Sequence, residues 1–197
     1  MSNKLSNSHL QIDINNESWH NILQNYVQRF KVFVDKERAQ VDEQRGKGKG
    51  SLEDDCAEFR AAHEARQDAV GKVDELVAVT DVLINQQKHE KQFSILEHTS
   101  EIARLMNAGR STSCKSAKDR TSMSATLEFA TLLTKDFKLP AEQRLDLANN
   151  LRGKQGVRLE NCRLNTGKAK YAFNSVQQTY LPDELKPPKE TAGDNKS

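Results

Sequence analysis

The sequence lacks an apolar run long enough to cross a bilayer and lacks an amino-terminal secretory signal. A membrane-spanning helix needs about 20 consecutive apolar residues, and no run of that length occurs among the 197 residues. The opening stretch, MSNKLSNSHLQIDINNE, is polar and has no continuous apolar core. These absences exclude an integral membrane protein, and we expect a soluble, cytoplasmic protein.

Cysteine is scarce and is not arranged for metal binding or for a disulfide framework. The three cysteines are Cys56, Cys114 and Cys162, and no Cys-x-x-Cys spacing occurs. No histidine pairing indicates zinc either, so we predict neither a metal nor another cofactor. An odd number of widely spaced thiols is typical of a reducing, intracellular environment.

Net charge is also small, but it is unevenly distributed. The formal charge is +2, which indicates no nucleic-acid partner and leaves the oligomeric state open. Residues 110–120 hold four cations and one acid, and residues 45–49 hold three cations, so each segment contributes +3. Subtracting both from +2 leaves about −4 for the rest of the chain, which shows that the positive charge is concentrated locally.

Hydrophobic periodicity predicts a mostly α fold. We expect helices over 17–44, 51–107 with a break at NQQKHEKQ, 121–138, 140–151 and 168–180. The segment 152–167 looks turn-rich, and the proline-containing charged tail is expected to be disordered. The predicted organisation is an amino-terminal helical segment (1–44), a basic glycine-rich linker (45–50), a carboxyl-terminal region (51–182) and a disordered tail (183–197).

The most informative stretch is STSCKSAKDRTSMSATLE at residues 111–128. Five residues separate Cys114 from Arg120, and a predicted helix follows directly. A loop of that length can turn its backbone N–H groups inward and form an anion-binding nest, and the start of the helix adds its positive dipole end. Arg120 can take two phosphate oxygens at once, because its guanidinium is a planar fork. The stretch therefore predicts a phosphate-binding loop.

Cys114 is the expected nucleophile of this loop. The positive field should lower the pKa of its thiol from roughly 8.5, which favours the thiolate at neutral pH. A thiolate facing a bound phosphate can form a phosphocysteine intermediate, which water then hydrolyses. Two cations, Lys115 and Lys118, are expected to project toward the mouth of the loop, and the excess charge favours a polyanionic substrate such as a multiply phosphorylated inositol.

The other loop residues have open or supporting roles. Asp119 could protonate the leaving oxygen, or it could hold the loop through hydrogen bonds. Thr121 could assist the thiolate or cap the helix. The predicted catalytic residues are thus Cys114, Arg120 and Asp119, and the predicted substrate-binding residues are Lys115, Ser116, Ala117, Lys118 and Thr121. Cys162 is expected to be a core residue.

The stretch CKSAKDRTSMSATLE resembles the signature of the inositol polyphosphate 4-phosphatases. The likeness continues through ENCRLNTGKAKYAFNSVQQTYLP and, more loosely, INNESWHNILQNYVQRF. The resemblance implies metal-independent removal of the 4-phosphate of phosphatidylinositol 3,4-bisphosphate, with Cys114 as nucleophile and Arg120 as phosphate clamp. It also implies a phosphoinositide partner and peripheral association with plasma or endosomal membranes.

The sequence departs from that family in two respects. Family members are several times longer and carry an amino-terminal C2 domain, so this chain looks like a carboxyl-terminal part with an incomplete cysteine-phosphatase-like α/β core. The family also implies a strand before the loop, but AGRSTSC is polar, with Arg110 and Thr112 at positions expected to be apolar. The alternative to an enzyme is a truncated, non-catalytic phosphoinositide-binding or regulatory fragment.

Overall fold

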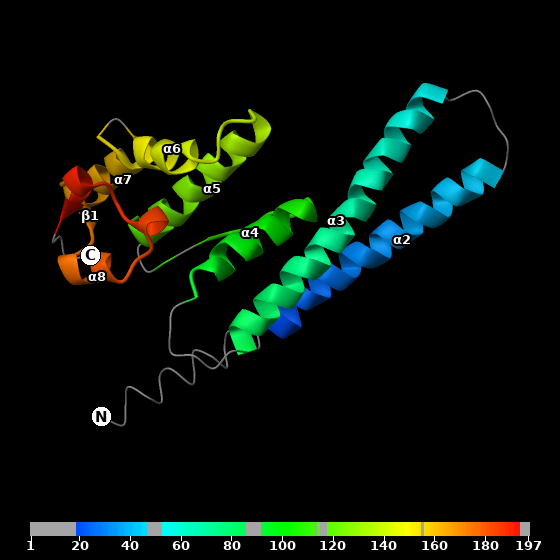
Figure 1. Cartoon of the computed structure of the whole chain (residues 1–197), viewed down its shortest axis with the longest axis horizontal. Coiled ribbons are helices and arrows are strands. Elements are labelled where there is room, and N and C mark those ends of the chain that lie inside the picture. Colours follow the sequence, from blue (N-terminus) through cyan, green and yellow to red (C-terminus); the bar gives the residue numbers. More distant parts are fainter. Residues whose placement is uncertain are drawn as a thin grey trace. The chain divides into compact units, whose positions relative to one another are not determined.

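Two compact units, residues 1–110 and 111–197, make up the chain. The computed structural model describes residues 19–46, 53–85, 92–112, 114, 118–154 and 156–193. Figure 1 shows that these residues are mainly helical. This confirms the predicted mostly α class. Of the predicted linker at 45–50, residues 45 and 46 belong to the helix Gln24–Gly46, and residues 47–50 lie outside the described residues. The two compact units divide after Arg110.

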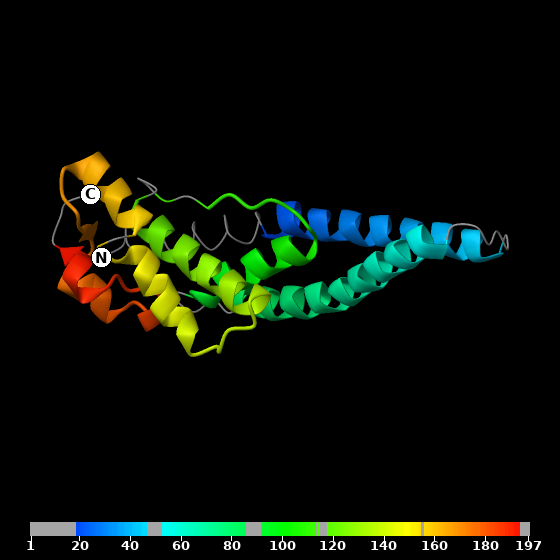
Figure 2. The same cartoon turned by 90° about the horizontal axis from the view of Figure 1, so that it is seen from above.

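The first unit is built on two long helices that run side by side (Figures 1 and 2). Its elements are η1 (Trp19–Leu23, a π-helical turn), α2 (Gln24–Gly46), α3 (Glu53–Asn85) and α4 (Ser94–Leu105). The segment predicted as one tract with a break thus contains α3 and α4. After α4, Asn107 adopts a left-handed backbone with φ 52°, a conformation that asparagine tolerates better than most residues. The helix stop predicted at 107–109 is confirmed.

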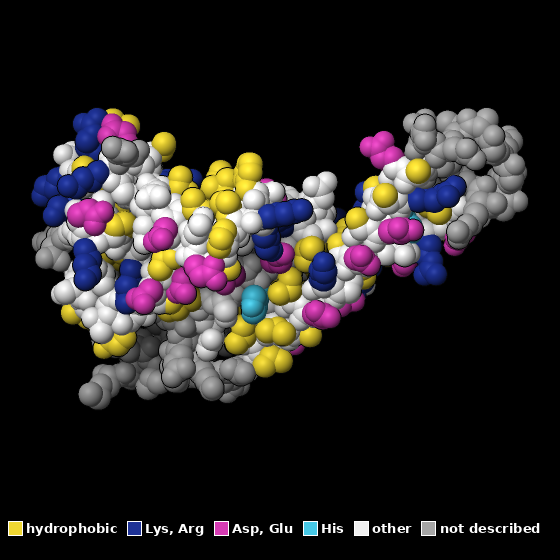
Figure 3. All heavy atoms as spheres, turned by 45° about the horizontal axis from the view of Figure 1, so that its top comes forward, with side chains coloured by type: hydrophobic (Ala, Val, Ile, Leu, Met, Phe, Trp, Pro, Cys, Tyr) yellow, Lys and Arg dark blue, Asp and Glu magenta, His cyan; other side chains and the backbone are white. Residues whose placement is uncertain are grey.

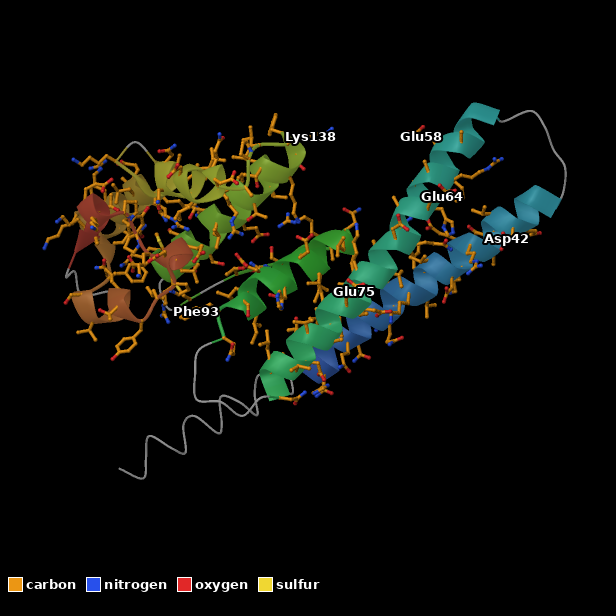
Figure 4. All side chains as sticks on the ribbon, viewed as in Figure 1. Asp42, Glu58, Glu64, Glu75, Phe93 and Lys138 are labelled. Carbon is orange, nitrogen blue, oxygen red and sulfur yellow. The ribbon has the colours of Figure 1, made fainter. Side chains whose placement is uncertain are left out.

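The core of the first unit lies where α2, α3 and α4 meet. Its buried members are Trp19, Val27, Val73 and Ile102. The indole Nε1 of Trp19 donates a hydrogen bond of 3.0 Å to Oδ1 of Asp81, so the polar edge of this ring is satisfied. Away from the core, the acidic residues labelled in Figure 4 on α2 and α3 are exposed, namely Asp42, Glu58, Glu64 and Glu75.

The second unit packs α5 (Arg120–Asp136) against α6 (Gln143–Arg152). The remaining elements are α7 (Val157–Thr166), β1 (Tyr171–Ala172), α8 (Ser175–Thr179), η2 (Asp183–Leu185), η3 (Lys189–Thr191) and β2 (Ala192–Gly193). The parallel pair β1–β2 joins Tyr171 to Ala192 and Ala172 to Gly193. Residues 108–112, where the resemblance implies a strand, have no regular secondary structure.

The turn-rich interpretation of residues 152–167 is wrong, because α7 occupies most of it. The glycines of this segment lie outside α7: Gly153 and Gly156 precede the helix and Gly167 follows it. Gly156 precedes α7, and a Cβ there would lie 2.1 Å from the carbonyl oxygen of Leu151, so only glycine permits this approach. Gly167 ends α7 in the left-handed conformation with φ 73°, as glycine commonly does after a helix.

The expectation of a disordered tail is also wrong for residues 183–193. Leu185 and Thr191 are buried, and β2 pairs with β1. Polar composition predicted disorder because it provides little apolar surface to bury, but here the backbone of the tail is held by hydrogen bonds. Residues 194–197 lie outside the described residues. Within the described helices, none combines the length and apolar character that a bilayer crossing requires.

Candidate active site

The site begins where the signature stretch enters α5. Cys114 is half-buried, and Arg120 is exposed at the first residue of α5. The predicted start of this helix, at about Thr121, is one residue from the observed start. Three of the predicted substrate-binding residues, Lys115, Ser116 and Ala117, lie outside the described residues. The Cys-x5-Arg loop and its inward-facing amides therefore remain a prediction.

Asp119 and Lys118 form a buried ion pair at the end of this stretch. Their residues are 6% and 5% exposed, and Lys118 Nζ lies 2.5 Å from Asp119 Oδ2. The other carboxylate oxygen, Oδ1, accepts a hydrogen bond of 2.8 Å from the backbone N–H of Ala172 in β1. Both oxygens of Asp119 are thus occupied. This arrangement fixes the carboxylate between its neighbour in the chain and a strand 53 residues away.

The structure differs from the expectation that Lys118 projects toward the mouth of the loop. Its ammonium turns inward to the adjacent carboxylate, because a buried cation needs a compensating charge. Its backbone is held as well, since the hydroxyl of Ser122 donates a hydrogen bond to the Lys118 carbonyl. The local charge available to a ligand is consequently smaller than a count along the sequence indicates.

Thr121 does not cap α5, which was one of the two roles open for its hydroxyl. It is the second residue of the helix, and its Oγ1 is buried without a hydrogen-bond partner. Asp119 occupies the position before the helix, but its side chain makes no capping bond. The first turn of α5 therefore has no side-chain cap from Asp119 or Thr121, and backbone N–H groups at a helix start are otherwise suited to anions.

Cys162 of α7 packs directly behind the loop. It is fully buried, and its thiol lies 3.9 Å from the carbonyl oxygen of Lys118, to which it donates. Burial raises the pKa of the Cys162 thiol to about 11, and the Asp119 carboxylate raises it further while Lys118 opposes the shift. The thiol is therefore neutral near pH 7. The prediction that Cys162 is a core residue is confirmed.

Arg152 at the end of α6 ties the tail to α5. It is 0% exposed, and burial lowers the pKa of its guanidinium to about 10. Its Nε donates to Thr126 Oγ1 (2.7 Å), and its Nη2 donates to the carbonyls of Met123 (2.9 Å) and Glu184 (2.7 Å). Nη1 donates to the Lys186 carbonyl at 3.1 Å. These acceptors are all neutral, so hydrogen bonds rather than an opposite charge hold this cation.

A second contact connects Arg152 to the strand that holds Asp119. The Tyr171 hydroxyl donates a hydrogen bond of 3.1 Å to the Arg152 carbonyl, and burial raises the pKa of this phenol. Tyr171 and Ala172 form β1, so the same strand contacts α6 through a side chain and Asp119 through a backbone N–H.

Sequence reasoning missed Arg152, Tyr171 and Ala172. The available signal was the spacing of Tyr171 and Phe173 two residues apart, which is typical of a strand, but the sequence was interpreted as a helix over 168–180, of which only Ser175–Thr179 is an α-helix. Burial of an arginine cannot be inferred from spacing.

The comparisons with known proteins agree on one family. A family model described as the INPP4A C-terminal domain matches residues 52–185. The chain is 39% identical over 108 residues to inositol polyphosphate 4-phosphatase type II of Homo sapiens, covering 55% of this chain and 12% of that protein. It is 38% identical over 108 residues to type II inositol 3,4-bisphosphate 4-phosphatase of Rattus norvegicus, with the same coverage. No solved structure matches. The chain thus corresponds to a small part of these relatives.

Proposed function

The chain belongs to the INPP4A C-terminal domain family, and from this premise we propose that it is the phosphatase part of a phosphoinositide 4-phosphatase. The proposed substrate is phosphatidylinositol 3,4-bisphosphate, and the name of the relatives, type II inositol 3,4-bisphosphate 4-phosphatase, supports an inositol 3,4-bisphosphate headgroup. The observation that carries the proposal is the anchoring of Asp119. A signature stretch held at its end by β1 and entering the start of α5 is suited to binding a phosphate.

In the proposed reaction, Cys114 Sγ attacks the phosphorus of the 4-phosphate while the bond from phosphorus to the inositol oxygen breaks. The leaving oxygen takes a proton and departs as a hydroxyl. Water then attacks the phosphocysteine, the sulfur–phosphorus bond breaks, and inorganic phosphate leaves with the thiolate restored. Arg120 would hold two of the phosphate oxygens throughout, because its fork matches their spacing.

For the remaining residues the geometry favours supporting roles. Of the two alternatives for Asp119, positioning is favoured over proton donation, since both of its oxygens already accept hydrogen bonds. We propose that Lys118 acts through Asp119 and that Lys115, with the small residues Ser116 and Ala117, faces the substrate. The hydroxyl of Thr121, buried and without a partner, is available to assist the thiolate.

A non-catalytic binding fragment is the second candidate. It is favoured by the coverage, because the aligned segment spans 12% of the human relative. Such a fragment would retain the anion-binding loop and bind a phosphoinositide without releasing phosphate.

The test is phosphate release from a panel of phosphoinositides by the purified chain and by Cys114→Ser. The enzyme proposal expects release from the 3,4-bisphosphate with wild type, and none with Cys114→Ser, while binding to the same lipid persists in both. Binding without release by wild type would favour the second candidate. Equal release by Cys114→Ser would contradict a phosphocysteine mechanism.

A further inference from the structure

The outward side of α7 exposes two aliphatic side chains, with Glu160 and Asn161 between them on the same side of the helix. Val157 is 80% exposed and Leu164 is 71% exposed, whereas Leu159 and Cys162 are buried on the inner side. Residues seven apart lie on one face of an α-helix, because seven residues make almost two turns. The two aliphatic side chains therefore project from the same side of α7, away from the core of the unit.

Positively charged residues flank these apolar side chains along the chain. Residues 154–170 contain five lysines and arginines against one acid, Glu160, which gives a net charge of +4. Lys154, Lys168 and Lys170 are exposed. Figure 3 shows lysine and arginine side chains gathered at the end of this unit where Figure 1 draws α7 and β1. Glu160 is hydrogen-bonded to Arg163, so the one acid of this segment is paired within α7.

The opposite end of the unit exposes apolar side chains without that charge. Phe129 in the second half of α5 and Phe137, which directly follows this helix, are 57% and 69% exposed, toward the end where Figure 4 labels Lys138. Figure 3 shows hydrophobic side chains gathered over this part of α5 and α6. Residues 128–146 hold three cations and four acids. Apolar exposure and positive charge therefore coincide at α7 and are separated at the end of α5.

α7 also adjoins the signature stretch. Its Cys162 contacts the carbonyl of Lys118, and the turn after it leads into Ala172, whose N–H binds Asp119. The helix thus supports the end of the loop with its inner side and presents its outer side to the surroundings.

We propose that this surface docks on an anionic lipid bilayer. The α7 face is defined by Val157 and Leu164 together with Lys154 and Lys168. Aliphatic side chains can enter the boundary between headgroups and acyl chains, while lysines around them meet anionic headgroups. The docking serves the proposed function, since a lipid substrate must be reached at a membrane, but binding itself requires no catalysis.

The experiment measures cosedimentation of the purified chain with vesicles of phosphatidylcholine, with and without phosphatidylserine. Two variants test the α7 face, Leu164→Ser and the double change Lys154→Glu with Lys168→Glu. Phe137→Ser is the matched control, because it removes an equally exposed apolar side chain from a region that is not basic. All four substituted positions are exposed, and circular dichroism melting checks that the variants are folded.

Wild type should bind the phosphatidylserine vesicles, with weaker binding as salt screens the charges. The double charge reversal should weaken partitioning at least about tenfold, because each lysine near such a surface is worth about fivefold. Leu164→Ser should weaken it several-fold, up to about tenfold, since a buried leucine side chain is lost. Phe137→Ser should bind as wild type does.

The proposal is overturned if wild type does not bind the anionic vesicles, or if Phe137→Ser loses as much binding as Leu164→Ser. Loss with the charge reversal but none with Leu164→Ser would also overturn it, in favour of a purely electrostatic contact without insertion of apolar side chains. Hydrolysis of water-soluble inositol 3,4-bisphosphate, measured on the same samples, separates this surface from the active site. If wild type binds vesicles and releases no phosphate, the α7 face stands and the proposed function fails.

Discussion

Arg120 and Arg152 show how differently one residue type is used in this unit. Arg120 is exposed at the start of α5, and Arg152 is fully buried at the end of α6. An exposed arginine contributes little to packing, so its substitution should affect ligand chemistry rather than the fold. A buried arginine that satisfies several acceptors should behave in the opposite way.

We expect Arg120→Lys to lower turnover about 100- to 1000-fold, because lysine keeps the charge but loses the bidentate fork. The melting temperature should stay near that of wild type. The measurement pairs a phosphate-release rate with a thermal melt on one preparation. Retention of most of the activity would contradict the role of Arg120 as a phosphate clamp.

Arg152→Ala should destabilise the second unit by about 2–4 kcal/mol, because it leaves buried acceptors without donors and opens a cavity. The carbonyls of Met123 and Glu184 and the hydroxyl of Thr126 are the groups affected. Urea unfolding followed by circular dichroism measures the change. Lys154→Ala, an exposed neighbour, is the control and should change stability by no more than about 0.5 kcal/mol.

Cys162 should resist alkylation and contribute a pH dependence to stability. The pKa of its thiol is raised to about 11 in the folded chain from 9.0, so the folded state keeps a proton that the unfolded state loses. Its contribution is complete below pH 9.0 and is lost as the pH rises toward about 11. Peptide mapping after iodoacetamide treatment near pH 8 should find Cys162 unmodified under native conditions and modified in urea.

The corresponding unfolding experiment compares wild type with Cys162→Ala across pH 8 to 11. Wild type should lose up to about 1.4 kcal/mol per pH unit within this window from this one group, and the variant should lack that slope. A slope that is equal in the two proteins would contradict the assignment to Cys162.

At the scale of elements, hydrophobic periodicity was enough to predict most of the long helices. It could not predict the tertiary contacts that hold α7 and the tail in the second unit. The start of α5 was predictable because small residues and a charged turn precede an apolar pattern. α7 was missed because Gly153 and Gly156 closely precede it, and glycines at such spacing usually indicate a turn. The ordered tail was missed because its order depends on Arg152, a donor that lies outside its own sequence.

The burial of Lys118 illustrates the same limit at the candidate site. Sequence placed Cys114, Asp119 and Arg120 in one loop, since they are close in the chain. It could not show that Asp119 accepts an N–H from Ala172 or that Lys118 turns toward Asp119. Both contacts depend on tertiary placement, and local charge counting treats every lysine as available to a ligand.

Truncation after Pro182 tests the tail as an element. It removes Leu185, the Glu184 and Lys186 carbonyls that Arg152 binds, and β2. We expect the second unit to lose at least about 2 kcal/mol of stability, because several buried donors lose their partners. Truncation after Gly193 is the control and should behave as the full chain does. A normal urea midpoint for the shorter chain would contradict a structural role for the tail.

For the whole molecule, the division into two compact units predicts that they respond separately to such a change. Trp19 is the single tryptophan of the chain and is buried in the first unit, so its fluorescence reports on that unit alone. In the chain truncated after Pro182, the urea transition of Trp19 should keep its wild-type midpoint, while circular dichroism detects an earlier transition. A shift of both midpoints together would show that the units unfold as one.

The parallel pairing of β1 with β2 has a consequence for synthesis of the chain. During synthesis Asp119 is added to the chain 53 residues before Ala172, and β2 at residues 192–193 is added later still. The hydrogen bond from the Ala172 N–H to the Asp119 carboxylate therefore forms only after residue 172 is made, and β1 pairs with β2 only after residue 193 is made. A chain that ends before residue 172, because of a nonsense codon or alternative splicing, would carry every residue of the signature. It would still lack the hydrogen bond that holds the Asp119 carboxylate. The motif in a shortened isoform is thus no guide to the geometry of its site.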